Sequence, residues 1–146
     1  MIAISVQPSH QEQKVLSFAS TLYLRPILNL LLAEVSPLWR HDLRLGLQEA
    51  LVNAACHGNR LDPNKLVVVH FTVTRHQYVW TIIDEGAGCP DRKSKDCGCE
   101  DPEFEQECGR GIYILRQIFD EVEWLPPGNH LRLCKDIRRD AAPHLV

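Results

Sequence analysis

Apolar residues recur at strand-like spacing in two stretches separated by three turn residues. Residues 65–74 (KLVVVHFTVT) are rich in β-branched side chains, and residues 78–84 (YVWTIID) follow the turn at 75–77. Because β-branched and aromatic residues favour a pleated, half-buried surface, the two stretches predict a β-hairpin. Residues 1–6 are predicted to form a strand or an extended arm. Further short strands are predicted over residues 14–20, 121–125 and 130–135.

Helical spacing appears in three other segments. The segment 25–35 (RPILNLLLAEV) has a proline in its first turn, and the segment from about 38 to 56 ends at Gly58 and Asn59, which suit a helix stop. A third helix opens at 109–111 and continues through IYILRQIFDEV. The resulting order is strand, helix, helix, strand, strand, helix, strand, strand. This order predicts an α+β fold, a two-layer sandwich in which a mixed or antiparallel sheet carries helices on one face.

Length and composition fit one globular domain. The 146 residues are 45% hydrophobic and 24% charged, with 16 basic and 19 acidic side chains and a net charge of −3. This balance gives no electrostatic reason to expect direct nucleic-acid binding. No apolar run is long enough to span a membrane, and the N-terminus lacks the pattern of a secretory signal. We therefore expect a cytoplasmic protein whose six cysteines are reduced.

Three polar residues stand out in the second predicted helix, in the stretch EALVNAACHGN. Glu49, Asn53 and His57 are spaced i, i+4, i+8, apart from a core stripe made of Leu43, Leu47, Ala50, Leu51 and Ala54. From spacing alone, a solvated outer face is as good an interpretation as a functional one. Small neighbours set this stripe apart from an ordinary charged face, and we interpret the alanines as leaving room for a ligand.

Two glycine-rich segments add candidate chemistry. Residues 84–88 (DEGAG) place a carboxylate at the end of an apolar strand, before two glycines that permit close backbone approach. Residues 109–111 (GRG) open a helix, where free N–H groups and an arginine can bind an anion. Taken alone, the first segment is a strand-ending turn and the second a loop–helix junction. The second is not a Walker A loop, because no GKS or GKT follows.

In this order, the three segments resemble the boxes of the GHKL ATPase superfamily, whose ATP-binding domain has the Bergerat fold. EALVNAACHG resembles the N box, DEGAG the first glycine box and GRGI the second. The spacing is most similar to the bacterial anti-sigma-factor serine kinases, and the resemblance covers about residues 14–136. It implies one histidine-kinase-like ATPase domain over residues 1–136, followed by a tail over 137–146. Within the domain it implies an N-terminal arm or strand over 1–13 and an ATP lid over 86–108.

The resemblance also implies roles for individual residues. Asn53 matches the N-box residue that ligates Mg²⁺, and Glu49 matches the carboxylate that orients or deprotonates the attacking group. Asp84 matches the carboxylate that accepts the adenine amino group. The glycines and arginine of the two glycine boxes would let the chain pass close to the base and cover the phosphates: Gly86, Gly88, Gly109, Arg110 and Gly111.

Two residues after the N box each have two alternative roles under this resemblance. His57 and Asn59 match positions that either contact the sugar or phosphates or simply end the helix. For His57 we favour the second role.

The activity implied by the resemblance is Mg²⁺-ATP-dependent phosphorylation of a serine or threonine. The implied partners are a STAS-type anti-sigma antagonist as substrate and a sigma factor that is sequestered, and the family implies a homodimer. An alternative keeps the ATP pocket without catalysis, as a silent partner-switch module, although Glu49 argues against it. The plainest alternative is an α+β interaction domain that binds no nucleotide.

Cysteines and tryptophans remain to be assigned. Cys97, Cys99 and Cys108 fall in the lid segment and can be metal-binding, redox-active or incidental, and we favour the last because the spacing is not CxxC and no histidine lies in the loop. Cys56 and Cys134 are expected to be buried and inert. The three tryptophans are expected to pack in or beside the core: Trp39, Trp80 and Trp124.

Overall fold

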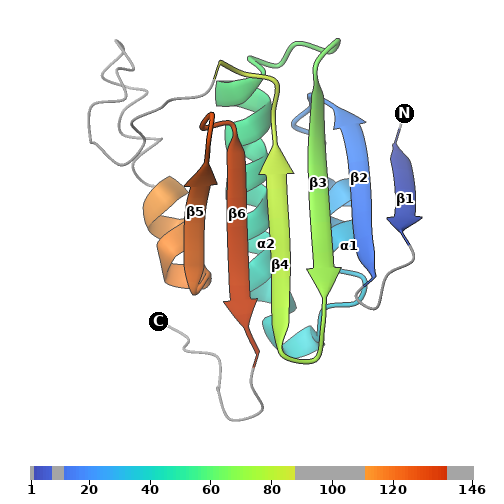
Figure 1. The fold of residues 1–146 in the computed structure, drawn as a ribbon, viewed down its shortest axis with the longest axis vertical. Helices are drawn as coiled ribbons and strands as arrows, with labels where there is room; N and C mark the ends of the chain where they lie inside the picture. Colours follow the sequence, from blue (N-terminus) through green and yellow to red (C-terminus); the bar gives the residue numbers. More distant parts are fainter. Residues whose placement is uncertain (1, 8–11, 88–110, 138–146) are drawn as a thin grey trace.

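A six-stranded sheet forms one layer of the protein, and helices cover one of its faces (Figure 1). The computed structural model describes residues 2–7, 12–87 and 111–137. The sheet is antiparallel at every pairing, in the order β1-β2-β3-β4-β6-β5. This confirms the predicted α+β sandwich and decides for an antiparallel sheet. The strands are β1 (Ala3–Gln7), β2 (Gln13–Ala19), β3 (Leu66–Val73), β4 (Gln77–Ile83), β5 (Glu121–Leu125) and β6 (His130–Asp136).

The helical layer contains α1 (Arg25–Leu31), α2 (Pro37–Val52), the π-helical turn η1 (Asn53–Gly58) and a helical segment over residues 111–118. The helix predicted over 25–35 is therefore shorter than expected. The helical conformation is disfavoured for a residue that precedes a proline, and Ser36, which precedes Pro37, is extended. The chain therefore leaves the helical conformation before α2 begins at Pro37. The intervening residues turn instead and bury Val35. The second helix continues beyond its α-helical part, as predicted, but its last turn is wider.

Alternating side chains of the strands point towards the helices and make the core. One register row runs across five strands, in the order Leu16, Val69, Ile82, Leu131 and Trp124. The first four side chains of the row are buried, and Trp124 is half-buried against the core. The two-residue period of the strands thus places the predicted apolar residues on one face.

The tryptophans pack as predicted. Trp39 and Trp80 are buried and Trp124 is half-buried. Trp80 meets the ring of Phe119 edge to face, with ring centroids 6.0 Å apart, and so connects the sheet to the end of the 111–118 helix. The same helix approaches α2 at Gly46, where a Cβ atom would lie 2.5 Å from Phe119 Cε2. A glycine at this position therefore allows the two helices to pack closely.

In the described ranges, no helix has both the length and the apolar character needed to cross a bilayer.

Candidate functional site

Glu49 and Asn53 lie one turn apart at the junction of α2 and η1. Glu49 belongs to the last turn of α2, and Asn53 is the first residue of η1. Both side chains are half-buried, whereas Leu43, Leu47 and Leu51 of the predicted core stripe are buried. The polar stripe is therefore neither a fully solvated face nor part of the core, so it is accessible to a ligand.

Gly111 covers these two side chains. A Cβ atom at Gly111 would lie 3.5 Å from Glu49 Oε2 and 3.4 Å from Asn53 Nδ2. The first described turn of the 111–118 helix thus passes directly over Glu49 and Asn53, although more than fifty residues separate them in sequence. A side chain larger than a methyl group would occupy the space above both polar groups.

Asp84 sits just after β4 and is only 8% exposed. Its carboxylate lies against the backbone of Gly58, where a Cβ atom would overlap both carboxylate oxygens. The same carboxylate accepts a hydrogen bond from Gly86 N–H (2.8 Å), and a Cβ at Gly86 would lie 2.6 Å from Gly58 O. Gly58 and Gly86 therefore fit around Asp84, which brings the end of the N-box segment next to the first glycine box.

Asn59 holds the same region together in a way that the sequence did not indicate. Its side chain is fully buried and makes three hydrogen bonds, to Ser20 Oγ (2.9 Å), Leu66 O (2.9 Å) and Glu85 N–H (2.7 Å). Its N–H donates to Ala54 O (2.9 Å) and closes the wide π turn. Asn59 does end the helix, and its side chain has no remaining capacity for a ligand apart from a second acceptor lone pair.

His57 lies in the last turn of η1 and is half-buried. A basic residue at a helix C-terminus interacts favourably with the helix dipole, which agrees with a role in ending the helix. That role stays a prediction, as does contact with a nucleotide.

The alanines of the N-box segment do not leave room for a ligand, contrary to our interpretation. Ala50, Ala54 and Ala55 are at most 4% exposed and belong to the hydrophobic core.

Several predicted site residues fall outside the described residues. These are Gly88, Gly109 and Arg110, together with the lid cysteines Cys97, Cys99 and Cys108 and all but the first two residues of the predicted lid. The assignments of these residues stay predictions.

The two thiols that the structure describes differ from each other. Cys134 is buried in β6, and burial, opposed by the charge of Arg132 and supported by Glu121 and Asp120, raises its pKa to about 11. This confirms the expected burial of Cys134, and the inertness of its thiol stays a prediction. Cys56 is only half-buried, which corrects the expectation of burial.

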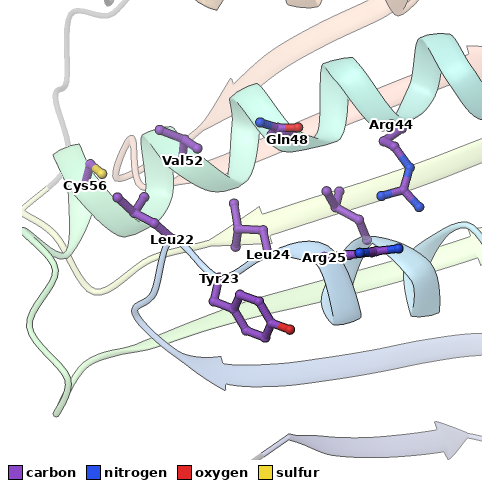
Figure 2. Close-up of a pocket in the computed structure, with 9 residues that line it drawn as sticks. Leu22, Tyr23, Leu24, Arg25, Arg44, Gln48, Val52 and Cys56 are labelled. Atoms are coloured by element: carbon purple, nitrogen blue, oxygen red, sulfur yellow. The ribbon is translucent and has the colours of Figure 1, made fainter.

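Cys56 lines a groove of about 570 Å³ between the second helix and the start of the first (Figure 2). Side chains of α2 and η1 form one wall, and residues 22–24 together with the start of α1 form the other. Neither Glu49, Asn53 nor Asp84 borders it, so this groove is separate from the candidate site. Its lining comprises Leu22, Tyr23, Leu24, Arg25, Leu28, Arg44, Gln48, Val52 and Cys56.

The chemistry of the donors suits a magnesium ion that arrives with phosphates. Glu49 Oε2 and Asn53 Oδ1 both lie within 3.7 Å of one point, the Cβ position at Gly111. Such hard oxygen donors are what Mg²⁺ prefers, and it usually keeps waters and substrate oxygens as its other ligands. Within residues 2–7, 12–87 and 111–137, no three His, Cys, Asp or Glu side chains form a cluster that could hold a metal without such help.

This combination of an antiparallel sheet, a polar N-box helix and a carboxylate packed between glycines agrees with one family of domains. The family model of the histidine kinase-like ATPase domain matches residues 21–135, and the chain belongs to this family.

Among curated proteins, the chain is similar to serine-protein kinase RsbW of Bacillus subtilis (strain 168), with 31% identity over 86 residues. That match covers 56% of this chain and 54% of the relative. It is also 31% identical over 83 residues to the anti-sigma F factor of Geobacillus stearothermophilus, covering 56% of each chain. A more distant anti-sigma F factor, from Clostridium perfringens (strain 13 / Type A), is 25% identical over 84 residues, or 56% of this chain and 59% of the relative. The chain thus spans somewhat more than half the length of these curated relatives.

Proposed function

We propose that this protein is a Mg²⁺-ATP-dependent serine/threonine kinase that phosphorylates a STAS-type anti-sigma antagonist and sequesters a sigma factor. The observation that carries the proposal is the convergence of Glu49 and Asn53 under Gly111, combined with an Asp84 carboxylate packed against Gly58. The names of the relatives, a serine-protein kinase and anti-sigma F factors, support the reaction and the partners. A homodimer completes the proposal by analogy with the family.

In this proposal, Asp84 selects the base. A carboxylate only accepts hydrogen bonds, so it pairs with the amino group of adenine and repels the carbonyl oxygen that guanine carries at the same position. Asp84 is well suited to this because it is mostly buried and its carboxylate already accepts a hydrogen bond from Gly86. Gly88 would pass beside the base, and Gly109, Arg110 and Gly111 would cover the phosphates.

Glu49 is the proposed base for phosphoryl transfer. The partner's hydroxyl oxygen forms a bond to the γ-phosphorus, the bond to the leaving ADP oxygen breaks, and the hydroxyl proton passes to Glu49. Asn53, one turn along the helix, is the proposed Mg²⁺ ligand. Mg²⁺, when bound, would neutralise charge on the phosphates. Positioning by Glu49 and Asn53 is the contribution of this chain.

Label transfer from γ-labelled ATP to a STAS-type partner tests the proposal. We expect Glu49→Gln to lower transfer by 10²–10⁴-fold, roughly the value of a general base, with little change in ATP affinity. Asn53→Ala is expected to weaken binding of Mg²⁺-ATP as well. Glu123→Gln makes the same change at an exposed site on β5 and serves as the control.

The outcomes separate the alternatives. ATP binding without any transfer to the partner would favour the catalytically silent partner-switch module. Absence of ATP binding would remove the nucleotide-dependent proposals and leave the plain interaction domain.

A further inference from the structure

The backbone around Asp84 is held by two asparagines. Asp84 N–H donates to Asn129 O (3.1 Å), and Asn129 Nδ2 donates to Asp84 O (2.7 Å). The next N–H along the chain, that of Glu85, donates to Asn59 Oδ1 (2.7 Å). Three consecutive main-chain polar groups are therefore fixed by partners from two distant parts of the sequence.

The orientation of the Asn59 side chain is fixed because both N–H groups of its carboxamide donate hydrogen bonds. Its Nδ2 reaches Ser20 Oγ at the end of β2 and Leu66 O in β3, and the residue is completely buried. Its side chain thus links two strands to the segment that follows a third, and it cannot turn without breaking several buried hydrogen bonds.

Asn129 holds Asp84 from the opposite side. It precedes β6 in a tight turn in which Gly128 has a φ of 103°. Within the described part of the chain, its buried Oδ1 has no donor, so the bond that its side chain makes is the one to Asp84 O.

We propose that Asn59 and Asn129 are positioning residues that fix the main chain at Asp84, and thereby set the preference for adenine over guanine nucleotides. This inference rests on the proposed role of Asp84 in base selection. A carboxylate discriminates between the two bases only while it cannot rotate away from the repulsive guanine oxygen. The three main-chain bonds fix the position from which the Asp84 side chain starts, and the Gly86 N–H bond and the backbone of Gly58 hold its carboxylate there, so the acceptor is pre-organised.

The test compares the dissociation constants of ATP and GTP, with Mg²⁺, by calorimetry. Asn129→Leu keeps the approximate size of the side chain but removes the bond to Asp84 O. We expect it to lower the preference for ATP, the ratio of the GTP to the ATP dissociation constant, by about tenfold, the equivalent of one good hydrogen bond. Ser20→Ala removes an anchor of Asn59 and is expected to lower the ratio in the same direction, by roughly threefold.

Val69→Ala is the matched control, because it destabilises the buried core in β3 and Val69 is not among the hydrogen-bond partners given above for either asparagine side chain. A merely structural role predicts that all three variants lower the melting temperature and none changes the ratio. That result, with wild-type protein that prefers ATP, would overturn the positioning role alone. Wild-type protein that binds neither nucleotide, or binds both equally, would overturn the role of Asp84 and this inference together. Ser20→Ala retains most of the fold's contacts, so it keeps the test decisive should Asn129→Leu fail to fold.

Discussion

Replacing Gly58 by alanine should disturb Asp84 more than the backbone. Gly58 is the last residue of η1, and alanine is favoured over glycine in a helix by up to about 1 kcal/mol. The added Cβ, however, would overlap the Asp84 carboxylate. Since the carboxylate end of a side chain moves more easily than two backbone segments, we expect Asp84 to rotate away.

The structure allows the cost to be worked out. Rotation breaks the 2.8 Å hydrogen bond from Gly86 N–H to the carboxylate, which is worth about 1.5–3 kcal/mol for a charged acceptor. An unfavourable rotamer adds about 0.5–1.5 kcal/mol. Subtracting the helical gain of alanine leaves a net loss of about 1–4 kcal/mol in the free energy of unfolding. If Asp84 selects adenine, the affinity for ATP should fall by at least about tenfold as well.

Urea unfolding and ATP titration measure the two effects, and a double-mutant cycle assigns them. In an Asp84→Ala background the carboxylate is absent, so Gly58→Ala should be neutral or stabilise by up to about 1 kcal/mol. The reasoning is refuted if Gly58→Ala is as stable and binds ATP as tightly as the wild type. It is also refuted if its cost is the same in both backgrounds, because the contact with Asp84 would then not be the cause.

Three further predictions concern packing and reactivity. Gly46→Ala should push Phe119 away from α2 and cost about 1–3 kcal/mol in urea unfolding, an overpacking effect that Phe119→Leu should partly relieve. Trp80 Nε1 is buried and finds no acceptor in the described residues. Trp80→Phe removes this nitrogen, and we expect it to lower the free energy of unfolding by less than the roughly 3–5 kcal/mol usual for truncating a core aromatic residue to alanine. A larger loss would mean that the indole N–H is paired. Cys134 has a pKa of about 11, so roughly one molecule per thousand carries the thiolate at pH 8. Iodoacetamide labelling mapped by mass spectrometry should therefore leave Cys134 unmodified in the native protein. Rapid labelling at pH 8 would contradict its burial.

The fold could be predicted from the sequence because the inner strands of the sheet carry a two-residue period and α2 carries an apolar stripe. The apolar face shared by Val67, Val69 and Phe71 in β3 is visible without any knowledge of the partners. The choice between a mixed and an antiparallel sheet was not visible, because β4 pairs with β6 rather than with the strand that follows it. Such a pairing depends on the complete set of contacts and leaves no local signal.

The candidate site was predictable only where residue type implies chemistry. Glu49, Asn53 and Asp84 are polar residues in apolar surroundings, and their order resembles a known family. Asn59 was interpreted as a helix stop, since an asparagine after a glycine is a common one. Its side-chain partners Ser20 and Glu85 lie 39 and 26 residues away in sequence, so no local pattern could reveal them.

For the alanines of the N-box segment, the sequence suggested a ligand-facing role that the structure does not support. A small residue on a helix is compatible with either a ligand-facing or a tightly packed surface, and the helical wheel does not distinguish them. Ala50, Ala54 and Ala55 are buried in the hydrophobic core, and the sequence pattern does not specify which side of the helix the rest of the chain covers.

The order of the strands also links the candidate site to the folding reaction. Two pairings, β2 with β3 and β4 with β6, join strands separated by long stretches of chain, and closing such loops costs entropy before the contacts are gained. The Asn59–Ser20 bond lies beside the first pairing and the Asp84–Asn129 bonds beside the second. The set of hydrogen bonds around Asp84 is therefore complete only in molecules that have closed both loops. Amide hydrogen exchange at Asp84 should then proceed through global unfolding, and a bound nucleotide should slow exchange across the whole sheet to the same extent.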